Sequence, residues 1–197
     1  MRKARKLRAI MMTPQLVLPM SITGLCTILV AFALLVYGIF IYNQFVWLRN
    51  NIAKAWANID VLLLQRGDEI SKLVQLCQHY MQYEQETLQQ VVLARDTVLN
   101  ARALKHLQQL PVVQQQLQQV LNQLLMVAEN YPDLKTQPLF AQLTSRISAL
   151  EIAIADRRVF YNESVTAYNN RLQIIPDTLI AHLLRFKPAE WLKTNNA

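Results

Sequence analysis

Apolar residues fill one stretch of the chain completely and recur at regular intervals over the rest. No charged residue occurs between Arg8 and Arg49, and residues 22–41 are almost wholly apolar. Twenty helical residues rise about 30 Å, which is the thickness of the hydrocarbon core of a bilayer. Tyr37, Tyr42 and Trp47 gather toward the far end of this stretch, where aromatic rings favour the membrane interface. We therefore predict a transmembrane helix at 22–42, preceded by a tail at 1–21.

A cleaved signal peptide and a lipoprotein anchor are the alternatives for this stretch. The apolar run is longer than that of a signal peptide, and no A-x-A cleavage site follows it. Leu25, rather than a small residue, precedes Cys26, and hydrophobic sequence continues beyond that cysteine. An uncleaved single-pass helix is the favoured interpretation.

From Ile52 onward, apolar residues alternate spacings of three and four, a period of 3.5 that is typical of helices packed on one another. The predicted helices are about 44–83, continuous with the membrane helix, then 84–110, 111–131 and 137–175. Pro111, the Asn130–Asp133 run and Pro176 mark their ends. Short connections favour an antiparallel, coiled-coil-like four-helix bundle at 43–175. The predicted fold is all-α: an N-terminal transmembrane helix continuous with this long-helix bundle, then an amphipathic segment at 176–197.

Composition excludes several kinds of site. The chain has 197 residues and three glycines, the last of them Gly67. This disfavours glycine-rich phosphate loops and hairpin-rich β folds. The three histidines do not have the spacing of a metal site, and no nucleophile motif occurs. Cys26 lies inside the apolar stretch and Cys77 far outside it, so we expect no disulfide between them. We predict no enzyme, no metal site and no cofactor.

Charge is distributed unevenly along the chain. The net charge is +7, and five of the 20 Lys and Arg residues lie in the first eight positions, before any acidic residue. This predicts a cytoplasmic tail with the body on the opposite side of the membrane. Arg49 and Lys54, which follow the apolar run, weakly favour the reverse orientation. Contact of the tail with anionic lipid is a second interpretation. The body has no basic stripe with interleaved aromatic residues, so nucleic acid is not an expected partner.

Several polar residues fall on or beside the apolar seams. Arg66 and Arg157 occupy seam positions in the first and last helices, and a buried arginine is unfavourable unless it is paired. The residues predicted to form a structural polar core are Asn58, Asp60, Arg66, Asp68, Arg157, Asn162, Tyr168 and Asn169. An ion-pair network that sets helix register is favoured over a conformational switch or a binding site. Alternatively, the arginine stems extend to the surface.

The C-terminal segment combines aromatic and basic residues. Its candidate membrane-interface residues are Arg185, Phe186, Lys187, Trp191 and Lys193. An even number of helices would return the chain to the membrane side, where such a segment can lie among headgroups. A hydrophobic cap across the mouth of the bundle is an equally supported alternative.

Four blocks of sequence have a distinctive composition and order. They are 55–61 with Gln65, Arg66 and Asp68; 128–135; 160–162 with Val165, Tyr168, Asn169 and Arg171; and 186–191. Together they resemble the LemA family over about residues 42–192. One departure is the run from Gly67 to Lys72, where the family typically has a second arginine followed by Leu-Ile-Pro-Asn. The resemblance implies a helical bundle anchored in the bacterial inner membrane and implies no particular activity.

The expected function is a noncatalytic, membrane-tethered bundle that organises or scaffolds a membrane protein complex, with self-assembly as one route. A lipid-interacting membrane-remodelling protein is the alternative, based on the basic tail and the C-terminal segment. A membrane-bound hydrolase is a second alternative. The expected partners are the lipid bilayer, through a single span, other membrane proteins and further copies of the chain.

Overall fold

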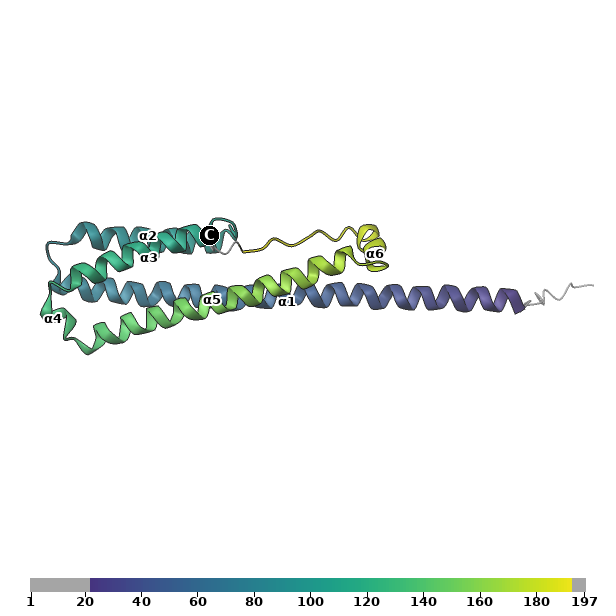
Figure 1. Ribbon diagram of the computed structural model, residues 1–197, viewed down its shortest axis with the longest axis horizontal. Coiled ribbons are helices and arrows are strands. Elements are labelled where there is room, and N and C mark those ends of the chain that lie inside the picture. Colours follow the sequence, from purple (N-terminus) through teal and green to yellow (C-terminus); the bar gives the residue numbers. More distant parts are fainter. Residues whose placement is uncertain (1–21, 193–197) are drawn as a thin grey trace, which may run out of the picture. The chain divides into compact units, whose positions relative to one another are not determined.

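The computed structural model describes residues 22–192, so the predicted tail at 1–21 and Lys193 lie outside the described residues. Over that range the protein contains α-helices and no strand, which confirms the all-helical prediction (Figure 1). The chain divides into two compact units, Met1–Phe40 and Ile41–Ala197. Helix α1, Ile22–Tyr80, contributes residues to both.

In the first unit, α1 is long and apolar enough to cross a membrane, by length and composition. Its large apolar side chains are exposed rather than covered by other parts of the chain. Phe32 is 64% exposed and Leu34 66% exposed. The helix of a soluble core would instead bury such side chains.

The second unit contains the remainder of α1 and five further helices. They are α2 Gln85–Ala103, α3 Leu110–Ala128, α4 Pro132–Lys135, α5 Pro138–Gln173 and α6 Asp177–Leu183. The prediction that the second helix extends to residue 110 is wrong, because the chain turns between α2 and α3. Lys105 adopts a left-handed φ of 52° there. Pro111 lies in the first turn of α3, as expected, since a proline lacks only an N–H that has no partner at that position.

Side chains of α1, α2, α3 and α5 share one hydrophobic core. Ile59, Val91, Leu124 and Val165, one from each helix, are all completely buried. Polar contacts show in which direction α2 and α5 run along α1. The pairs are Asp60–Arg102 and Ser71–Arg95 between α1 and α2, and Arg66–Glu151 and Glu69–Arg146 between α1 and α5. In both sets, residue numbers rise along α1 as they fall along the partner helix.

A second, smaller core brings the end of α5 to the first turns of α1 in this unit. Ile41, Phe45, Tyr168 and Ala181 are buried together. Phe45 stacks on Phe186 with ring centroids 5.0 Å apart and meets Tyr168 edge to face at 6.2 Å. The chain after α6 is therefore held against the same part of α1 as the end of α5.

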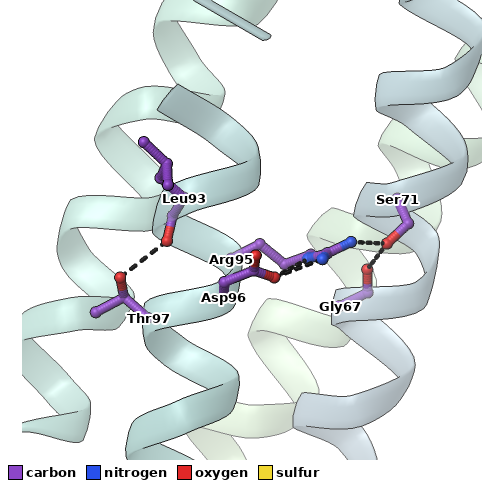
Figure 2. A network of polar contacts seen from close by, with 6 residues as sticks. All are labelled: Gly67, Ser71, Leu93, Arg95, Asp96 and Thr97. Carbon is purple, nitrogen blue, oxygen red and sulfur yellow. Dashed lines mark hydrogen bonds and ion pairs between the residues drawn. The ribbon is translucent and has the colours of Figure 1, made fainter. Parts of the chain in front are cut away.

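Helices α1 and α2 meet beside Gly67, where the Arg95 side chain of α2 reaches Ser71 of α1 (Figure 2). A Cβ built on Gly67 would lie 3.2 Å from Cδ2 of Leu99. Beside this contact, Arg95 of α2 donates hydrogen bonds to the Ser71 hydroxyl and the Asp96 carboxylate. Ser71 in turn donates to the Gly67 carbonyl at 2.8 Å. The glycine thus combines close helix packing with a polar link between the two helices.

We expect Gly67→Leu to destabilise the protein by ~1–3 kcal/mol, because a large side chain would force α2 away from α1. Gly67→Ala should be nearly neutral, since better helix propensity offsets the mild contact with Leu99. Thermal unfolding of the full-length protein in detergent, followed by circular dichroism, checks both. Equal stability of the Leu variant and the wild type would contradict the close approach.

Candidate functional site

The polar interior of the second unit is centred on Arg66. Only 3% of this residue is exposed, although it lies among apolar neighbours on α1. Its Nη2 donates to Oε1 of Gln118 on α3 at 2.6 Å and lies 3.5 Å from Oε2 of Glu151 on α5. Burial lowers the pKa of Arg66, and the Glu151 charge acts in the opposite direction. One side chain therefore links three helices.

A second arginine shares this cluster. Burial lowers the pKa of Arg158, the positive charge of Arg66 lowers it further, and Glu151 opposes both effects. The single carboxylate of Glu151 thus interacts electrostatically with both cations. Its side chain is 41% exposed, so water also reaches the cluster. The Nε atoms of both arginines have no hydrogen-bond partner among the described residues.

The prediction that Arg157 lies in the polar core is wrong, because its side chain is exposed and Arg158 occupies the inward position. Ile154 and Tyr161 are both buried and seven residues apart. A 3.5-residue period places the intermediate inward residue at either 157 or 158. The helix turns the second of these arginines toward the core.

The prediction that Asp68 belongs to the polar core, which rests on its place within a turn of Arg66, is also wrong, because the structure exposes Asp68 and buries Glu69 instead. Glu69 pairs with Arg146 of α5 at 3.2 Å and with Lys72 at 3.1 Å. Asn58 is exposed on α1 and takes no part in the core. Asp60 is half-buried and pairs with Arg102 of α2 at 2.8 Å.

Asn162, Tyr168 and Asn169 form a different group from the arginine cluster. They bind the backbone of residues 187–192, which we call the C-terminal strap. The Asn169 amide donates to the Ala189 carbonyl and accepts from the Ala189 N–H, each at 2.9 Å. Asn162 makes the same paired contacts with Leu192, at 2.8 and 2.9 Å. Tyr168 donates to the Lys187 carbonyl at 3.0 Å.

The spacing of the two asparagines matches the strap. Seven helical residues rise about 10.5 Å, and three residues of extended chain cover about 10 Å. Asn162 and Asn169 can therefore bind residues 192 and 189 at the same time, so the strap runs antiparallel to α5. Tyr161, which sequence reasoning missed, adds a bond to the Glu190 carbonyl at 3.1 Å. Leu192 is consequently 1% exposed.

The predicted membrane-interface residues lie in and before this strap. Phe186 is packed in the smaller core, while Arg185 and Lys187 are exposed. Trp191 is 49% exposed, and its indole N–H donates to the Thr166 hydroxyl at 3.1 Å. The segment thus lies along α5 and leaves its basic side chains free to contact another molecule.

A pocket of about 530 Å³ opens beside the strap. Its apolar wall includes Ile52, Trp56, Leu107 and Phe186, together with the rings of Tyr161 and Tyr168. The basic residues that line it are Arg49, Lys105, Arg185 and Lys187. None of the described residues that line it is acidic. We call this the cationic pocket. The sequence pattern marks Arg49 only for its bearing on membrane topology and does not mark Lys105.

The buried thiol and phenol groups of the second unit carry little reactive chemistry. Burial raises the pKa of the Cys77 thiol to about 11, so the thiol is protonated and unreactive at neutral pH. Burial likewise raises the pKa values of Tyr161 and Tyr168. Within residues 22–192, no group of three His, Cys, Asp or Glu side chains is arranged to hold a metal ion. The arrangement is suited to fixing helices and to binding an anion.

Comparison with known proteins gives one clear result. A search of curated proteins finds no match. The family model described as LemA family matches residues 55–197, which is most of the chain and covers the Arg66 cluster, the two strap-binding asparagines and the strap itself. The chain therefore belongs to the LemA family.

Proposed function

We propose that this protein is a noncatalytic, membrane-anchored scaffold whose antiparallel four-helix bundle organises a membrane protein complex. The observation that supports it best is the Arg66 cluster. Arg66 joins α1, α3 and α5 through Gln118 and Glu151, while Arg102 and Arg95 tie α2 to α1. Such cross-links specify one helix register and favour a rigid body over a flexible one. The exposed apolar helix at 22–40 supplies the anchor.

The outer face of α5 offers a surface for a partner or a second copy. Ile152 and Val159, seven residues apart and so on one face of the helix, are 64% and 57% exposed. Phe160 beside them is 50% exposed. A membrane anchor confines such a surface to two dimensions and raises its effective concentration toward other membrane proteins.

A photo-crosslinking amino acid placed at Ile152 or Val159 of the full-length protein tests this function in native membranes. We expect discrete adducts with membrane proteins or with a second copy. The same probe at Gln89, an exposed polar position on α2, is the control. Identical adduct patterns at all three positions would contradict a specific scaffolding surface.

We further propose a bacterial inner-membrane location with the tail in the cytoplasm and the bundle on the opposite side. The support is the excess of five cations before the apolar run over the two that follow it closely, Arg49 and Lys54. Protease added to intact spheroplasts should therefore cut the bundle. Protection in spheroplasts together with cleavage in inverted vesicles would reverse this orientation.

A further inference from the structure

The cationic pocket has a backbone feature that packing alone does not explain. Lys105 and Arg185 are the only non-glycine residues with positive φ in the described part of the chain, at 52° and 57°. Each follows a helix, α2 or α6, and each stands where the chain turns back. The N–H groups of His106 and Phe186 bond the carbonyls of Ala101 and Ala181. This is the Schellman helix end, whose left-handed position is usually glycine because a Cβ is strained there.

The two strained positions both carry a basic side chain, and both line the same pocket although they lie 80 residues apart in the sequence. Strained backbone is retained mainly where a side chain is needed at that place. Arg49 and Lys187 complete a set of four cations, none of which forms an ion pair with the residues described here. Four uncompensated cations around one concavity attract an anion.

The wall of the pocket indicates what kind of anion fits. The hydroxyls of Tyr161 and Tyr168 are already bonded to strap carbonyls, so these residues offer the pocket mainly their rings. Trp56 meets Tyr161 edge to face at 6.2 Å and extends this aromatic wall. A basic rim over an aromatic and aliphatic wall matches an amphiphile that has an anionic head and an apolar remainder. The volume lies within the usual range for small-molecule sites.

We propose that the cationic pocket binds the headgroup of an anionic glycerophospholipid. Its phosphate pairs with the four cations, and its glycerol and first acyl carbons lie on the aromatic wall. Arg49 follows Tyr42, the last residue of the apolar segment, by seven positions, which reach at most about 25 Å. The pocket therefore stays close to the lipid surface if the segment spans a bilayer. This inference uses the anchoring in the proposed function but not the scaffolding.

Native mass spectrometry of the full-length protein in neutral detergent tests the proposal. With dioleoyl phosphatidylglycerol and dioleoyl phosphatidylcholine offered at equal concentration, we expect at least tenfold greater retention of the anionic lipid. Equal retention of the two lipids would overturn the proposal. Displacement of phosphatidylglycerol by millimolar inorganic phosphate would show that the pocket takes the free anion, and would overturn the assignment to lipid.

Paired charge variants locate the site. Arg185→Gln with Lys187→Gln should lower phosphatidylglycerol retention at least tenfold. Arg157→Gln with Lys135→Gln removes the same charge from exposed positions outside the pocket and should leave retention unchanged. A fall of equal size in both pairs would show general electrostatic attraction, and would overturn the proposal.

Two further variants test whether the lipid occupies the pocket itself and whether lipid retention can be lost without loss of stability. Ala53→Trp fills the pocket without changing charge and should lower retention as strongly as the pocket charge pair. Unchanged retention in this variant would overturn occupancy of the pocket. Arg185→Gly relieves the left-handed backbone, so the melting temperature should stay equal or rise while lipid retention falls. Retention at the wild-type level in this variant would show that the Arg185 side chain does not contribute to lipid binding. All of these readouts are independent of any scaffolding partner.

Discussion

Arg66→Ala is expected to destabilise the protein by ~2–4 kcal/mol, whereas Arg66→Met should remain within about 1 kcal/mol of the wild type. The alanine variant leaves a cavity where a long side chain joins α1, α3 and α5. Methionine fills most of that space and removes a charge whose burial is unfavourable, as the lowered pKa of Arg66 indicates. It also relieves the repulsion between Arg66 and Arg158.

We expect Arg66→Met to change stability only slightly because Glu151, the ion-pair partner of Arg66, is partly exposed. Removing one member of a buried ion pair normally destabilises a protein because the other charge is left without solvent or partner. Glu151 is 41% exposed and keeps the neighbouring Arg158, so it is not left in that state. The Met substitution also removes the hydrogen bond to Gln118, and this loss destabilises the protein by about 1 kcal/mol.

Thermal unfolding of the full-length variants measures both effects. For a protein of this size, a loss of ~3 kcal/mol lowers the melting temperature by about 6–12 °C. Arg157→Ala and Arg157→Met are matched controls on the exposed face of α5 and should change stability by less than ~0.5 kcal/mol. If Arg66→Met were as unstable as Arg66→Ala, the guanidinium contacts rather than the packed stem would stabilise the helices.

The helices of the second unit could be predicted from the sequence because their apolar residues keep a strict spacing. From Ile52 onward, the alternating spacing of three and four passes through Ile59, Leu63, Ile70, Leu73 and Cys77, and all five are buried. The same rule fails for polar neighbours. Where two adjacent residues are chemically alike, a period of 3.5 fits either one.

Arg157 with Arg158 is a case of this failure, and the second arginine is the inward one. Asp68 lies beside the seam rather than on it, and its neighbour Glu69 is the buried residue instead. The partners of Arg158 and Glu69 supply the missing information, and these lie far away in the chain. Glu69 is selected by Arg146, and Arg158 shares Glu151 with Arg66. A single sequence read along its length does not reveal such pairings between helices.

The strap and the pocket could not be predicted for a different reason. The strap is extended chain held by side-chain amides bonded to its backbone, and such contacts do not depend on which side chains the strap carries. The only local signal was the pair of asparagines seven residues apart on a helix face. Likewise, nothing local marks Lys105 as left-handed, because that position usually carries glycine.

Asn169→Asp is expected to release the strap almost as strongly as Asn169→Ala, although aspartate has nearly the same shape as asparagine. The amide of Asn169 both donates to the carbonyl of Ala189 and accepts from its N–H. A carboxylate can accept but not donate, and it would place a negative charge against the Ala189 carbonyl oxygen. Each unpaired buried group then opposes docking by ~1–3 kcal/mol.

Hydrogen exchange of peptides covering residues 187–192 is the measurement, because it reports local opening rather than global unfolding. We expect both Asn169 variants to lower protection of the strap by about ten- to a hundredfold, which corresponds to ~1.4–2.8 kcal/mol. Leu192, 1% exposed in the docked strap, should become solvated in the same event. Protection within the α1 core around Ile59 should not change.

Asn170→Asp provides the matched control, since residue 170 is the exposed neighbour on the same helix and contributes the same change of charge. It should leave strap protection at the wild-type level. The corresponding change at Asn162 should release Leu192 in the same way. The Asn162 amide makes the same pair of bonds to Leu192, three residues after Ala189 in the strap. Wild-type protection in Asn169→Asp would show that the paired bonds between the Asn169 amide and Ala189 contribute nothing to docking of the strap.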